Sequence, residues 1–77
     1  MTGKAKVAEV SGQVWTTIGS DNVDFLKDLA EEARSHGFEV ELDLSWSPIL
    51  KLKHDKVNVE YLKKALEAKG LQVILVE

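Results

Sequence analysis

The stretch NVDFLK at residues 22–27 recurs as NVEYLK at residues 58–63, with four positions identical and two conservatively replaced. A second match follows each copy, because GFEVEL at residues 37–42 corresponds to GLQVIL at residues 70–75. The second unit is three residues shorter between its two motifs. Two units are too few for a solenoid, which needs at least about three stacked repeats. The repetition therefore predicts a closed domain built from two pseudo-symmetric halves.

Each copy of the motif carries the signals that begin a helix. Asn22 and Asn58 can act as N-caps, and an acidic residue two positions later favours the positive end of the helix dipole. Apolar residues then recur at spacings of three and four, which predicts one buried stripe on each helix. The stripes consist of Leu26, Leu29, Ala30 and Ala33 in the first helix and of Val59, Leu62, Ala65 and Leu66 in the second.

Gly37 and Gly70 stand where each helix should end, because glycine readily adopts the left-handed conformation needed just beyond a helix. After each glycine the apolar period changes from about 3.6 to about 2, which is typical of a strand with one buried face. Strands are predicted at residues 13–18, 38–44, 49–53 and 71–76.

The resulting order, strand–helix–strand–strand–helix–strand, predicts an α+β fold of the ferredoxin-like split βαβ type. Both helices would cover one face of an antiparallel sheet, and residues 1–77 would form a single domain with its two halves in residues 13–77. Residues 1–12 are expected to form an extra N-terminal strand or arm. This segment is either a fifth strand turning into residues 13–18, a long bulged strand, a flap over the open face, or a strand lent to a partner chain.

The sheet face opposite the helices is the candidate binding surface. Alternation along residues 13–18 predicts that Trp15 and Thr17 point outward beside Lys51 and Lys53. If Trp15 instead faces the core, the register is shifted by one residue, which would turn every side chain of that strand to the other face.

The predicted surface has a charged half and an apolar half. Its outermost strand contributes the acidic residues Glu39, Glu41 and Asp43, which can pair with the two lysines. The last strand contributes Ile74 and Val76, and an exposed apolar patch on a small protein indicates a contact site. The alternative is that the N-terminal segment covers these residues. Trp46, in the loop before Pro48, is either a further binding anchor or folded back onto the core.

Composition excludes several classes of function. With 44% hydrophobic and 30% charged residues the chain should fold, and its net charge of −3 disfavours duplex DNA binding. The chain has no cysteine, which excludes disulfides, thiolate nucleophiles and cysteine-based zinc sites. No stretch approaches the roughly 20 apolar residues that span a bilayer, and the N-terminus lacks a signal-peptide core. We therefore expect a cytoplasmic protein without a membrane partner.

Candidate catalytic groups are few. His36 falls in the last turn of the first helix, where a histidine caps carbonyl groups. His54 and Asp55 follow a strand and could act as a general base with an orienting carboxylate. No nucleophile motif, glycine-rich phosphate loop or metal-ligand spacing accompanies them, so no cofactor or metal is expected. Enzymatic activity is left uncertain, with a non-enzymatic role favoured.

Three functional hypotheses follow. The first is a protein-interaction module that uses Trp15, Thr17, Trp46, Ile74 and Val76, and that forms a homodimer through the open face or the N-terminal strand. The second is a single-stranded RNA- or DNA-binding domain that uses Trp15, Lys51 and Lys53. The third is a small enzyme or ligand-sensing domain that uses His54 and Asp55.

Overall fold

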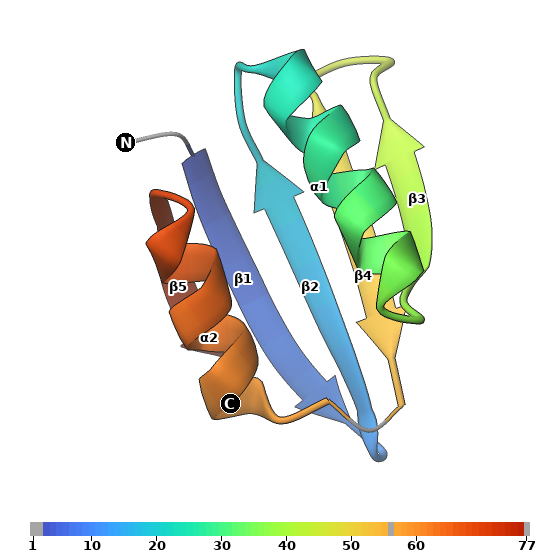
Figure 1. Cartoon of the computed structure of the whole chain (residues 1–77), viewed down its shortest axis with the longest axis vertical. Coiled ribbons are helices and arrows are strands. Elements are labelled where there is room, and N and C mark those ends of the chain that lie inside the picture. The colour runs from blue at the N-terminus through green and yellow to red at the C-terminus, as the bar shows by residue number, and fades with distance from the viewer. Residues whose placement is uncertain (1–2, 56, 77) are drawn as a thin grey trace.

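The computed structural model describes residues 3–55 and 57–76. Its elements follow the order β1 (Gly3–Val10), β2 (Gln13–Gly19), α1 (Val23–Ser35), β3 (Glu39–Asp43), β4 (Ile49–His54), α2 (Val59–Ala68) and β5 (Leu71–Val76). The strands form one five-stranded sheet in the order β3-β4-β2-β1-β5. Figure 1 shows both helices on the same side of this sheet, with α1 over β3 and β4 and α2 over β5 and β1. Within the described residues, the other side of the sheet carries no helix.

Both helices begin at the predicted asparagines. The Asn22 side chain accepts a hydrogen bond from the Phe25 N–H at 3.0 Å, and the Asn58 side chain accepts one from the Tyr61 N–H, also at 3.0 Å. These bonds satisfy backbone donors that have no partner inside the helix. The helices contain 13 and 10 residues, so the predicted difference of three is confirmed.

The end of α1 is fixed by a glycine in the left-handed region. Gly37 has φ +87°, and its N–H donates to the Arg34 carbonyl oxygen at 3.1 Å. The Phe38 N–H donates to the Ala33 carbonyl oxygen at 3.0 Å, which completes a Schellman motif. The chain therefore reverses within two residues of the helix and enters β3.

The N-terminal segment is an internal strand of the sheet. β1 pairs antiparallel with β2 through the two-residue turn Ser11-Gly12, in which both residues have positive φ values of 54° and 80°. Such turns match the twist of a hairpin. On its other side β1 pairs in parallel with β5 along its length, from Gly3 opposite Leu71 to Ala8 opposite Val76. Residues 1 and 2 of the predicted arm lie outside the described residues.

This position of β1 corrects the predicted topology. A ferredoxin-like sheet would place the last strand beside residues 13–18, and it would be wholly antiparallel. Instead β1 occupies that place, β5 pairs with β1, and the sheet is mixed. The physical reason is the tight turn at Ser11-Gly12, which pairs β1 with one edge of β2. That edge is then not available to β5. β1 is hydrogen-bonded on both sides, so it is neither a flap nor a strand with a free edge to lend.

The core lies between the sheet and the helices. Its members are buried apolar side chains from β1, β2, β4, β5 and both helices: Ala5, Val7, Val14, Ile18, Leu26, Leu29, Ala30, Ala33, Leu50, Leu52, Leu62, Leu66 and Leu71. One polar residue, Thr16, is 1% exposed among them, and its hydroxyl has no hydrogen-bond partner in the described part of the chain. Leu44, predicted to belong to a strand, lies beyond β3 and is exposed.

Candidate interaction surface

The sheet face turned away from the helices, here called the open face, has the register that the alternation predicts. Val14 and Ile18 are buried under the helices, whereas Trp15 and Thr17 point outward. In the ladder between β2 and β4, Trp15 lies opposite Lys53 and Thr17 lies opposite Lys51. The shifted register, in which Trp15 would face the core, is therefore wrong.

Trp15 is the largest side chain on the open face and is 45% exposed. The Lys53 ammonium lies 5.3 Å from the centre of its ring, within the range of a cation–π contact. Lys53 also lies 3.7 Å from a carboxylate oxygen of Glu39. The lysine is thus held between an aromatic ring and a carboxylate, and one face of the tryptophan is partly covered by a cation.

In the charged half of the open face, two of the three predicted acidic residues lie opposite the lysines, whereas Asp43 lies opposite Ile49. Glu39 lies opposite Lys53 and Glu41 lies opposite Lys51 in the ladder between β3 and β4. Cross-strand pairs of opposite charge stabilise a sheet modestly. A hollow of 300 Å³ beside Trp15 is lined by residues of this half.

The apolar half differs from the prediction because β1 lies inside it. Ala8 of β1 is opposite both Trp15 and Val76, so these three residues form one apolar row across the sheet. Val10 extends the row along β1 and is exposed. Ile74 lies in the next row of the sheet. We call the following five residues the apolar patch: Trp15, Ala8, Val76, Val10 and Ile74. Sequence reasoning missed Ala8 and Val10 because it left the path of residues 1–12 open between a fifth strand and three other arrangements.

β1 also brings two further lysines to the open face. Lys6 lies between Thr17 and Ile74, and Lys4 lies between Gly19 and Gln72. Neither lysine forms an ion pair within residues 3–55 and 57–76. With Lys51 and Lys53, the face therefore carries four lysines around Thr17 and Trp15, a feature that sequence reasoning also missed.

Asp43 forms a local turn at the acidic edge of the sheet. Its carboxylate accepts hydrogen bonds from the Ser45 hydroxyl at 2.6 Å and from the Ser45 N–H at 3.0 Å. The hydroxyl bond and then the backbone bond hold the pKa of Asp43 below its ordinary value. This turn leads into the loop that carries Trp46, which is 96% exposed and does not fold back onto the core.

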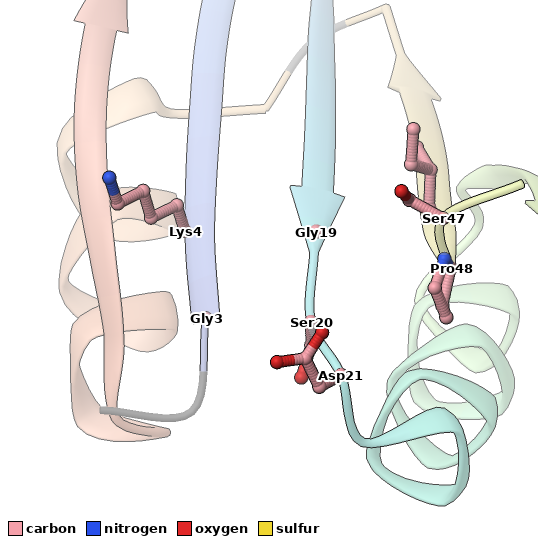
Figure 2. A pocket seen from close by; sticks show the side chains of 8 residues that line it. Gly3, Lys4, Gly19, Ser20, Asp21, Ser47 and Pro48 are labelled. Atoms are coloured by element: carbon pink, nitrogen blue, oxygen red, sulfur yellow. The ribbon is translucent and has the colours of Figure 1, made fainter.

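A second hollow of 480 Å³ lies at the other end of the open face (Figure 2). Gly19 forms part of its lining without a side chain, and Lys4 is directed away from Ser20 and Asp21. The Ser20 hydroxyl accepts a hydrogen bond from the Asn22 N–H at 3.1 Å. The polar groups around this hollow do not converge on a common point, so it lacks the arrangement expected of a catalytic site.

A third cavity, of 150 Å³, lies on the opposite side of the molecule between the two helices. Its lining is mainly apolar, and the Lys69 ammonium contacts the Glu32 carboxylate at 2.7 Å on its rim. Ligand pockets usually occupy about 300 to 1,000 Å³. This groove is therefore too small to be the preferred site.

The predicted pair His54 and Asp55 lies at the end of β4 and just beyond it. The His54 ring packs against Phe38 with 4.8 Å between ring centres, and Asp55 is exposed. His36, predicted in the last turn of the first helix, is the C-cap residue just after α1, and its backbone N–H donates to the Ala33 carbonyl oxygen at 3.1 Å. Among the described residues, no three side chains of the His, Cys, Asp or Glu type are grouped to hold a metal ion. The open face remains the stronger candidate.

Comparisons with protein-family models, curated proteins and solved structures found no match to this chain. Within the described ranges, neither helix is long and apolar enough to cross a membrane.

Proposed function

We propose that the protein is a non-enzymatic protein-interaction module, and that its open face binds an acidic segment of a partner that also carries apolar side chains. The observation that carries this proposal is the apolar patch, in which Trp15 and Val76 are both close to half-exposed on the side of the sheet without helices. Contiguous apolar surface rimmed by charged groups is typical of protein contact sites.

The charges around the patch favour an acidic partner. Lys6 and Lys4 stand beside the patch without an acidic partner among the described residues, so carboxylates of a bound segment could pair with them. A second copy would offer acidic residues of its own open face, but Glu39 and Glu41 already lie opposite Lys53 and Lys51. The open face is therefore better suited to a different protein than to a second copy.

Selection from a random peptide library tests this proposal, because it does not require the partner to be identified first. Enriched peptides should combine Asp or Glu with aromatic or aliphatic residues, and the amide chemical-shift changes that they cause should map to β1, β2 and β5. Trp15→Lys should abolish binding, whereas Tyr61→Lys, at an exposed aromatic on α2, should leave it unchanged. Peptides that shift the helices instead of the open face would contradict the proposal.

Single-stranded nucleic acid is the second candidate, favoured by the aromatic ring of Trp15 lying among four lysines. Such binders combine aromatic stacking with cationic side chains along the backbone. The hypothesis ranks lower because Glu39 and Glu41 stand opposite the two lysines of β4, and because the whole chain has a net charge of −3.

Fluorescence titration separates the two candidates. In a Trp46→Phe background Trp15 is the only tryptophan, and excitation at the red edge of tryptophan absorption avoids Tyr61. Mixed-sequence RNA at low salt should quench Trp15 if the face binds nucleic acid. That quenching should weaken with added salt and disappear in Lys51→Glu/Lys53→Glu. An emission spectrum that RNA does not change would eliminate this candidate.

A further inference from the structure

The two edges of the sheet differ sharply in chemistry. β3 forms one edge, and every second residue of this strand, on the open face, is acidic: Glu39, Glu41 and Asp43. β5 forms the other edge and reads LQVILV, without a charge, a proline or a glycine. Edge strands are usually blunted by charges, prolines or bulges, because their free backbone groups can pair with another strand. β3 has such protection and β5 does not.

The geometry of β5 also suits pairing. All six of its residues are in continuous register with β1, so no bulge interrupts the strand. Ile74, Leu75 and Val76 are 40%, 39% and 47% exposed, although all three are large apolar residues. They lie on both sides of the sheet, because Ile74 and Val76 point to the open face and Leu75 to the helix side. A strand added at this edge would cover apolar groups on both sides.

We propose that β5 pairs antiparallel with β5 of a second copy, joining two five-stranded sheets into one. A two-fold axis normal to the sheet near Ile74 places Ile74 opposite its own copy, Gln72 opposite Val76, and Val73 opposite Leu75. Each of these pairs is uncharged, so no like charges meet. The equivalent pairing of β3 with its copy would bring Glu39, Glu41 and Asp43 of two chains together.

A second copy also fits better than an unlimited stack of chains. Pairing of β5 with β3 of the next copy would be head-to-tail and could grow into a fibre, but it would place acidic residues against an apolar strand. The symmetric β5 contact uses the one unprotected edge of each chain and leaves the acidic edges outside. Assembly therefore stops at two chains.

This contact can be tested separately from the proposed function, because substitutions at different residues should abolish the β5 contact and binding at the open face. Leu75 lies on the helix side of β5, away from the open face, whereas Trp15 lies on the open face two strands away from the free edge. In the joined sheet the apolar patches of both copies would lie side by side. An extended partner segment could then contact both.

Sedimentation over a wide concentration range tests the inference on the whole chain. The parent should be a dimer, Leu75→Lys should be a monomer at the same concentration, and Trp15→Lys should remain a dimer. Circular dichroism of each variant checks that it is folded. A parent that stays monomeric up to millimolar concentration would overturn the inference, as would a dimer that Trp15→Lys dissociates and Leu75→Lys does not. In that last case the open face is the self-association surface and the second copy is its partner.

Disulfide trapping gives a second measurement that does not depend on Leu75→Lys. The chain has no cysteine, so each variant contains only the introduced thiol. Any disulfide that forms must join two copies at that position. Directly opposite residues in a sheet have the separation that a disulfide requires. Ile74→Cys should therefore form a covalent dimer on mild oxidation, whereas Glu41→Cys on β3 should not. Equal cross-linking of both variants, or of neither, would overturn the inference.

Discussion

The Lys53 ammonium lies 5.3 Å from the centre of the Trp15 ring, and the two residues are direct neighbours across the ladder between β2 and β4. A double-mutant cycle with Trp15→Leu and Lys53→Met should give a coupling of about 0.5–1 kcal/mol, the usual range for an exposed cation–π contact. Urea unfolding measures it. The same cycle with Lys51→Met in place of Lys53→Met is the control, and a coupling of equal size there would show that the ring contact is not the cause.

Thr16→Val should raise the free energy of unfolding by about 1 kcal/mol. Thr16 is buried, and its hydroxyl finds no partner in the described part of the chain, so valine removes an uncompensated polar group while keeping the shape. Thr17→Val, next to it but exposed, should change stability by less than about 0.5 kcal/mol. Denaturant unfolding compares the two variants, and a Thr16→Val protein less stable than the parent would contradict the expectation.

Gly3→Ala and Gly19→Ala should affect the free energy of unfolding differently, although the two glycines lie on neighbouring strands. A Cβ atom at Gly3 would collide with the carbonyl oxygen of Gly19 and lie 3.0 Å from the Ser20 Cβ, whereas one at Gly19 would meet nothing within 4 Å. Gly3→Ala should therefore lower the free energy of unfolding by about 1–3 kcal/mol. Gly19→Ala should leave it unchanged or raise it by up to about 1 kcal/mol. Thermal unfolding of both proteins tests this, and equal losses would refute the difference.

Ser45→Ala should raise the pKa of Asp43 toward its ordinary value, because it removes the hydroxyl donor that stabilises the carboxylate. A pKa that is lowered in the folded state contributes stability above the ordinary carboxyl pKa, and this contribution is lost as pH falls through the folded value. The variant should therefore lose less stability on acidification than the parent. Carboxyl NMR titration measures the pKa. Ser47→Ala, in the same loop, should leave the titration of Asp43 unaltered.

Local signals in the sequence predicted the helices and the faces of the strands after residue 12. The caps at Asn22 and Asn58 and the stop at Gly37 depend on residues within a few positions of one another, so a single chain displays them completely. Alternation likewise indicated an outward Trp15, with the register shifted by one residue as the alternative, and it indicated that the acidic residues of β3 face Lys51 and Lys53.

The order of the strands could not be predicted in the same way. Ala5 and Val7 alternate with lysines and indicate a strand, but a strand pattern does not specify which neighbours it pairs with. The turn at Ser11-Gly12 indicated one neighbour, β2. The other neighbour, β5, depends on contacts between distant parts of the chain, and so the prediction missed Lys4, Lys6, Ala8 and Val10 on the open face.

The parallel ladder between β1 and β5 joins the first and last strands described, so it has consequences for how the chain acquires its structure. β1 can form its hairpin with β2 as soon as both have been synthesised, but its second edge stays vacant until residues 71–76 have followed. Closing so long a loop costs chain entropy before any contact compensates for it, which slows folding in proteins of high contact order. A nascent chain that lacks β5 would present the vacant edge of β1 to solvent and to chaperones, and completion of the sheet would be the last step of folding.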